Sequence, residues 1–157
     1  MGQKALRKTK SKNTLSNKKN TRKNLSKKSI ENKTKMHLVK VFLELLNMVK
    51  LYHWKTHSYA EHKATDELYS KLNENIDKFI EVLLGKDQSR VHMLESRIDL
   101  LDFHKKKDFQ ERIIEYRSFL TELNIYFDSS RDSDLLTIRD EILVDINQFL
   151  YLLTFDK

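Results

Sequence analysis

No proline occurs in this chain of 157 residues, and Gly2 and Gly85 are its only glycines. Proline and glycine form most of the turns between β-strands, so their scarcity disfavours an all-β fold. The chain also contains no cysteine. These absences exclude a disulfide framework, a cysteine-based zinc site and glycine-rich phosphate loops. The composition therefore argues against an all-β fold, and the helical periodicity described below predicts an all-α fold.

Charge divides the chain into two parts. Residues 1–35 contain 13 lysines and arginines and one acidic residue, whereas residues 36–157 contain 17 basic and 22 acidic residues. The basic part has almost no apolar side chains, so burial cannot offset the entropy lost on ordering it. We expect a disordered basic arm over residues 1–35 and a folded body over residues 36–157.

The basic arm favours a polyphosphate partner. Many lysine–phosphate contacts release counterions, which gives strong, salt-dependent binding without sequence preference. A solubilising tail and a nuclear-localisation signal are the alternatives. No run is apolar enough to span a membrane or act as a secretory signal, so we expect an intracellular protein. The predicted nucleic-acid-binding residues are Lys4, Arg7, Lys8, Lys10, Lys12, Lys18, Lys19, Arg22, Lys23, Lys27 and Lys28.

The body has the periodicity of four helices. Apolar residues at helical spacing predict a first helix ending near His57 and further helices near residues 58–84, 108–127 and 134–155. Ser58 and Glu61 have the spacing of a capping box at the start of the second helix, and Gly85 is placed to end it. The short first connection predicts antiparallel neighbours. The connection between the second and third helices is longer, and we expect a short helix in it around His92–Phe103.

The second helix also carries a polar stripe. His62, Asp66, Asp77 and Glu81 lie on one side of it, away from the apolar stripe. The His62/Asp66 pair and the Asp77/Glu81 pair each have i, i+4 spacing, and imidazole with carboxylate suits iron, zinc or manganese. The pairs are about 22 Å apart at a rise of about 1.5 Å per residue, so one chain cannot close a site with both. Two chains packed antiparallel about a two-fold axis can, and His53 could add a ligand.

Two other interpretations of these residues remain open. Acidic residues on an outer helix face are commonly only solvated, and a histidine beside an apolar stripe is commonly a packed core residue. His53 and His57 also have i, i+4 spacing and form a competing zinc-like pair.

Several segments of the body resemble the Dps miniferritins, a DNA-protecting branch of the ferritin-like superfamily. Leu51-Tyr52-His53-Trp54 matches that family's Leu-x-His-Trp. The segment from His62 to Tyr69 is similar to its His-x-x-x-Asp-x-Leu-Tyr, and Asp77 with Glu81 to its Asp-x-x-x-Glu. Ser133 to Leu136 and Phe149-Leu150 resemble parts of its last helix. The resemblance covers about residues 36–157.

The resemblance implies a ferritin-like antiparallel four-helix bundle that oxidises Fe(II) and stores the ferric product. It implies a dinuclear iron site between two-fold-related subunits, with His53, His62 and Asp66 from one chain and Asp77 and Glu81 from its mate. Zinc or manganese would also suit these ligands. The family assembles as a dodecameric shell, and members with basic arms bind and condense DNA without sequence preference.

The same resemblance suggests a divergent branch, such as one in large DNA viruses, and a nucleoid-associated or virion-enclosed location. It also places Asp128, Asp132 and Asp134 where the family lines a pore with acids, although acids at such a turn are common helix caps. The alternative to a ferroxidase is a DNA-packaging scaffold with the same fold and no enzymatic activity.

Overall fold

The computed structural model describes residues 30–93 and 97–155. They form α1 (Asn32–Lys55), α2 (Tyr59–Asp87), α3 (Lys106–Glu122) and α4 (Ser133–Leu152), with a 3-10 turn, η1 (Leu123–Ile125), after α3. The described residues contain no β-strand. The predicted all-α class and the four helices are therefore confirmed.

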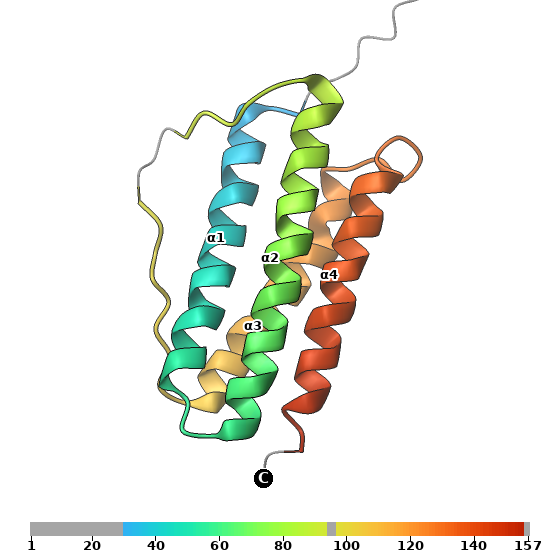
Figure 1. Ribbon diagram of the computed structural model, residues 1–157. Helices are drawn as coiled ribbons and strands as arrows, with labels where there is room; N and C mark the ends of the chain where they lie inside the picture. The colour runs from blue at the N-terminus through green and yellow to red at the C-terminus, as the bar shows by residue number, and fades with distance from the viewer. Residues whose placement is uncertain (1–29, 94–96, 156–157) are drawn as a thin grey trace, which may run out of the picture.

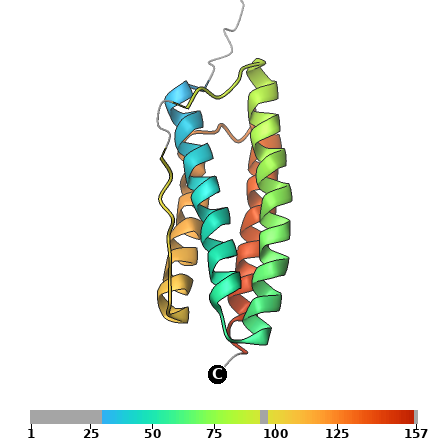
Figure 2. The same cartoon turned by 60° about the vertical axis from the view of Figure 1, so that its left-hand side comes forward.

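The helices pack side by side along nearly parallel axes (Figures 1 and 2). α1 and α2 run in opposite directions and are joined by a short turn. α2 and α3 run in the same direction, so the connection between them returns along the length of the bundle before α3 begins. α2 packs against both α1 and α4, and α3 packs against α4. One face of α2 is left uncovered by the other helices.

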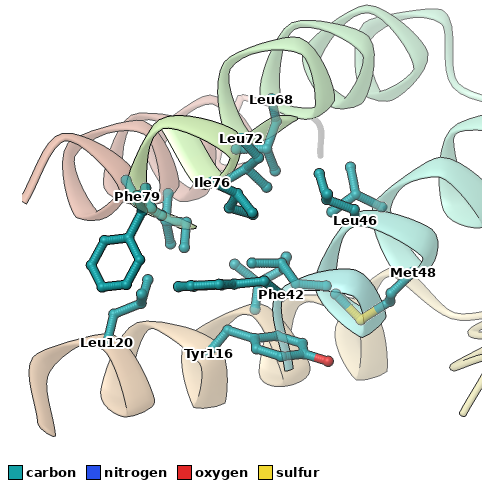
Figure 3. Packing of buried hydrophobic residues seen from close by; sticks show 14 of the residues in the cluster. Phe42, Leu46, Met48, Leu68, Leu72, Ile76, Phe79, Tyr116 and Leu120 are labelled. Carbon is teal, nitrogen blue, oxygen red and sulfur yellow. The ribbon is translucent and has the colours of Figure 1, made fainter. Parts of the chain in front are cut away.

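The core consists of the apolar stripes that helical periodicity predicts (Figure 3). Phe42 of α1 and Phe79 of α2 meet edge to face, with ring centroids 5.4 Å apart. Ile80, beside the apolar stripe of α2, is half-buried at the edge of the core. The buried residues that follow the helical spacing include Phe42, Leu46, Val49, Leu68, Leu72, Ile76, Phe79, Leu83, Phe109, Ile113, Tyr116, Leu120, Leu123, Leu135, Ile138, Ile142, Ile146, Phe149 and Leu153.

Of the two predicted ends of α2, the start is confirmed and the end is wrong. At the start, the Glu61 backbone N–H donates to the Ser58 side chain at 3.3 Å, which confirms the predicted cap. At the other end, the prediction that Gly85 caps the helix is wrong. α2 continues to Asp87, and Gln88 takes the left-handed conformation with φ of 55°. A glycine inside a helix costs only about 1 kcal/mol, so a contact beyond it can extend the helix.

That contact comes from Lys35, which belongs to the first turn of α1. Its ammonium group lies 2.5 Å from an Asp87 carboxylate oxygen and 2.6 Å from the Ser89 hydroxyl, and the residue is only 3% exposed. α1 thus begins at Asn32, before the predicted boundary at residue 36. Residues 30–35 are part of the folded body, while residues 1–29, with all the predicted nucleic-acid-binding residues, lie outside the described residues.

The short helix predicted around His92–Phe103 is not confirmed, because residues 88–93 and 97–105 are in no helix. The reason is length. The 18 residues between Asp87 and Lys106 must return along α1, whose 24 residues span about 36 Å. Coiled into a helix they would reach only about 27 Å. α1 side chains hold the extended segment: Asn32 bonds the His92 backbone, and Glu44 accepts from the Asp99 N–H at 3.2 Å.

Candidate metal centre

His53 and His62 form a stacked pair between the end of α1 and the start of α2. Their ring centroids are 3.9 Å apart and their planes differ by 23°. His53 lies on the inward face of α1 and is 7% exposed, whereas His62 lies on the exposed side of α2. The short α1–α2 turn brings the last turn of one helix beside the first turn of the next. Two predicted ligands nine residues apart are therefore in direct contact.

Reciprocal hydrogen bonds fix the orientation of both rings. His53 Nδ1 lies 3.0 Å from the His62 carbonyl oxygen, and His62 Nδ1 lies 3.0 Å from the His53 carbonyl oxygen. A carbonyl oxygen only accepts, so each Nδ1 carries the proton. In the neutral ring the lone pair then resides on Nε2. This is the arrangement that positions an imidazole as a metal ligand through its other nitrogen.

Asp66 lies next to this pair, one helical turn after His62. One of its carboxylate oxygens is 3.8 Å from His53 Nε2. The same oxygen is 3.9 Å from the ammonium group of Lys50 on α1. Lys50 also lies over the Tyr69 ring at 4.7 Å and near the Trp54 ring at 5.8 Å. The structure thus brings His53, His62 and Asp66 together, and it adds a lysine that sequence reasoning missed.

A second polar cluster supports the pair from inside the bundle. Thr65 is fully buried; its hydroxyl bonds the Glu61 carbonyl at 2.7 Å and lies 3.3 Å from His53 Nδ1. The Glu61 carboxylate, 6% exposed, accepts from the Tyr52 hydroxyl at 2.8 Å and the Thr56 hydroxyl at 2.6 Å. Lys106, the first residue of α3, lies 3.5 Å from its other oxygen. Glu61 therefore ties three helix ends together beneath the histidines.

The Glu61 cluster borders an open pocket of about 610 Å³ at the same end of the bundle. The α1–α2 turn and the residues around the start of α3 line this pocket. Its charged groups are already paired within the chain: Lys55 with Asp102 at 2.5 Å, and Lys106 with Glu61. These pairs leave it no strongly charged lining.

Asp77 and Glu81 lie farther along the same helix. The structure keeps α2 continuous through both polar pairs, so the carboxylates remain about 22 Å from the histidine pair at the helical rise of about 1.5 Å per residue. Both side chains are exposed. Neither forms a hydrogen bond or an ion pair with any described residue. The structure does not bring the two pairs together within one chain.

The described part of the chain contains no group of three or more His, Asp or Glu side chains arranged to hold a metal ion, so His53, His62 and Asp66 lie near one another without forming a complete site within one chain. The competing His53/His57 pair does not form either. α1 ends at Lys55, so His57 lies in the turn and is exposed while His53 points inward. The i, i+4 spacing does not place His53 and His57 on one helix face, because α1 ends between the two residues.

The acids before α4 support the turn rather than forming an open cluster. An Asp128 oxygen accepts from the Ser130 hydroxyl at 2.8 Å and from two backbone N–H groups at 3.0 Å. These bonds, chiefly the one from Ser130, lower the pKa of Asp128. Asp132 accepts from the Asp128 N–H at 2.9 Å, and Asp134 pairs with Lys86 at 2.8 Å. Asp132, at the N-cap of α4, makes no side-chain cap hydrogen bond, so the interpretation of these acids as helix caps is not confirmed, and their bonds stabilise the turn instead.

Some of the residues that sequence reasoning missed carried a weak signal. Thr65 is a polar residue inside the apolar stripe of α2, and Lys50 stands one turn before Trp54. Neither signal names the partner, because the contacts with His53 and Asp66 cross between helices. In the part of the chain that the structure describes, no helix is both long and apolar enough to cross a membrane.

Comparison with known proteins assigns the chain to a family. The model of a family of unknown function (DUF5856) matches residues 53–153, nearly two thirds of the chain, so the chain belongs to that family. The match begins at His53 and includes all five candidate ligands. None of the curated proteins compared with the chain matches it, and neither does any solved structure.

Proposed function

We propose that this member of DUF5856 is a Dps-like, ferritin-like protein that binds and oxidises Fe(II) at sites shared by two chains. The observation that carries the proposal is the His53/His62 pair, whose protons are held on Nδ1 beside Asp66. The direction of the helices and the resemblance of the motifs to Dps support the ferritin-like assignment. The donor set of imidazole and carboxylate fits iron.

The proposed dimer follows from the register of α2. When two α2 helices pack antiparallel about an axis between Lys71 and Leu72, His62 of one chain faces Glu81 of the partner subunit. Asp66 then faces the partner's Asp77. Ser70 and Asn73, both exposed, meet nearest the axis. Small polar side chains there allow close approach of the helices, and the two-fold symmetry creates two identical sites.

The stacking of the imidazoles favours two neighbouring ions at each site. Lone pairs of nearly parallel rings lie in the ring planes and do not converge on one ion. Two-metal sites hold their ions roughly 3.5–4 Å apart, and each of the two neighbouring rings offers its own Nε2 lone pair. We assign His53 with the partner's Asp77 to one ion, His62 with Asp66 to the other, and the partner's Glu81 as the bridging carboxylate.

The chemistry of the proposed reaction balances without any further cofactor. Two Fe(II) ions, one hydrogen peroxide molecule and two protons give two Fe(III) ions and two water molecules. Carboxylates favour the ferric product, and neutral imidazoles bind the ferrous substrate. The residues of this chain contribute by holding both ions side by side and by keeping the Nε2 lone pairs available.

The test is oxidation of Fe(II) by stoichiometric peroxide under anaerobic conditions, followed by ferric absorbance. The full chain should oxidise Fe(II) much faster than buffer alone, and Glu81→Ala should remove most of that acceleration. Glu122→Ala, which changes an exposed glutamate at the end of α3, is the matched control and should oxidise Fe(II) at the unchanged rate. Equal rates for Glu81→Ala and the full chain would contradict the ferroxidase proposal.

We propose that the basic arm binds DNA without sequence preference. Its charge opposes that of the acidic body, and it contains 11 lysines and arginines before residue 29. The test compares the full chain with one lacking residues 1–29 in gel-shift titrations at several salt concentrations. The truncation ends before Asn32, so it spares α1 and the buried Lys35.

The truncated chain should lose most of its affinity and most of its salt dependence, because released counterions supply both. Undiminished binding by the truncated chain would contradict the role of the arm. A chain that condenses DNA but neither retains nor oxidises iron would support the alternative, a DNA-packaging scaffold with this fold.

A further inference from the structure

Lys50 occupies a position that no ligand scheme for the centre explains. Its ammonium group is 3.9 Å from the Asp66 oxygen that also faces His53 Nε2 at 3.8 Å. Lys50 comes from α1 and Asp66 from α2, so the contact joins the two helices that hold the histidines. A lysine cation therefore sits beside the one carboxylate that a single chain places next to its imidazoles.

Two aromatic rings restrain this lysine. Its ammonium group lies 4.7 Å from the Tyr69 ring centroid and 5.8 Å from that of Trp54. Both distances are within the range of about 6 Å over which a cation is attracted to a ring face. One ring comes from each helix. Lys50 is thus attracted toward its place by two rings and a carboxylate rather than left to move freely in solvent.

The net charge of the half-site, meaning His53, His62, Asp66 and Lys50 of one chain, follows from this contact. Two neutral imidazoles, one carboxylate and one ammonium sum to zero, so a single chain offers a divalent cation no net negative charge. Asp77 and Glu81 of the partner subunit would each add one negative charge in the proposed dimer. On that basis we infer that the Lys50 ammonium group occupies the place of a metal cation beside Asp66. Metal binding then depends on the pairing of two chains, because only the partner adds negative charge.

This inference rests on the proposed inter-subunit site, and Zn²⁺ affinity tests it apart from iron oxidation. The measurement is competition with a chromophoric chelator, using the full chain in a Glu81→Gln background. That background removes one of the two carboxylates that the partner would supply, so the residues of the single chain contribute a larger share of the Zn²⁺ affinity. Adding Lys50→Met should tighten Zn²⁺ binding about tenfold, or about 1.4 kcal/mol. Methionine keeps an unbranched side chain of similar length and removes the ammonium group with its charge.

Two matched variants separate charge from shape and position. Lys50→Arg keeps the charge and should leave Zn²⁺ affinity unchanged. Lys63→Met removes an exposed lysine on α2 beside His62 and should also leave it unchanged. Equal affinities of the Lys50→Met and Lys50→Arg variants would overturn the role of Lys50. The proposed shared site fails by a different result, namely equal Zn²⁺ affinity of Glu81→Gln and the unaltered chain.

Discussion

The two halves of the outward face of α2 differ in how the chain supports them. In the first half, His62 and Asp66 are in contact with His53 and Lys50 of α1, and a buried network lies beneath them. In the second half, Asp77 and Glu81 extend into solvent. The same helix therefore presents one pair that is organised within the chain and one pair that is not.

This difference indicates where each half obtains its order. Imidazoles need a fixed tautomer to act as ligands, and backbone carbonyls nearby in the chain can supply it. Carboxylates need no such preparation, because either oxygen can bind a cation. A shared site can therefore combine the organised half, His62 and Asp66, with an unprepared half, Asp77 and Glu81. The side chains of the unprepared half become ordered only when two chains pair. The predictions below test the two halves separately.

The largest effect is expected at Glu61, which supports the organised half. Glu61→Leu removes the buried carboxylate that accepts from the Tyr52 hydroxyl and pairs with Lys106, so the chain should lose about 3 kcal/mol of unfolding free energy. Urea denaturation followed by circular dichroism measures it. Glu74→Leu, an exposed position on the same helix, should change stability by less than about 0.5 kcal/mol. If the two variants were equally stable, the organised half would not depend on this network.

The opposite pattern is expected at Asp77 in the unprepared half. Asp77→Asn should change the unfolding free energy by less than about 0.5 kcal/mol, because the side chain is exposed and bonds no described residue. Zn²⁺ affinity should nevertheless fall about 100-fold, an effect of about 2.7 kcal/mol, because a ligand is lost. Chelator competition and urea denaturation on the same sample measure both. Unchanged Zn²⁺ affinity would remove Asp77 from the site.

The helix faces could be predicted from the sequence because periodicity is a local property. Phe42, Leu72 and Ile113 are buried because their own helices place them inward. The Ser58 cap was also predictable, since donor and acceptor are three residues apart. The proximity of His53 to His62 followed from the short turn between their helices. Their tautomers did not, because the carbonyl partners become visible only in three dimensions.

Features set by distant contacts could not be predicted. α2 passes Gly85 because Lys35, 52 residues before Asp87, forms an ion pair at its end. The connection after α2 is extended because it must match the length of α1. Asp66 acquires Lys50 as a neighbour from another helix. In each case the sequence contains the residues but not the geometry that pairs them.

A smaller effect is expected at Thr65, within the organised half. Thr65→Val keeps the shape but removes the hydroxyl that bonds the Glu61 carbonyl and lies beside His53 Nδ1. Stability should fall by about 1 kcal/mol, the typical net contribution of one hydrogen bond. ¹⁵N chemical shifts of His53 should show a larger share of the Nε2-protonated ring. Thr121→Val, an exposed threonine with a similar backbone bond on α3, should leave both unchanged. Unaltered His53 shifts in Thr65→Val would mean that the backbone carbonyl alone sets the His53 tautomer and that Thr65 does not contribute.

The smallest effect is expected beyond the unprepared half, where Lys86 joins the end of α2 to the turn before α4. The hydrogen bond from Lys86 lowers the pKa of Asp134. A carboxyl whose pKa is lower in the folded chain stabilises it above its unfolded pKa of about 3.9, and loses that contribution as pH falls through the folded value. Because Asp134 is half exposed, the contribution should be only a few tenths of a kcal/mol. Asp134→Asn should therefore flatten the acid limb of the stability–pH curve slightly and leave Zn²⁺ affinity unchanged. Carboxyl ¹³C shifts measure the pKa directly, and a value for Asp134 at or above that of an unfolded peptide would contradict the assigned ion pair.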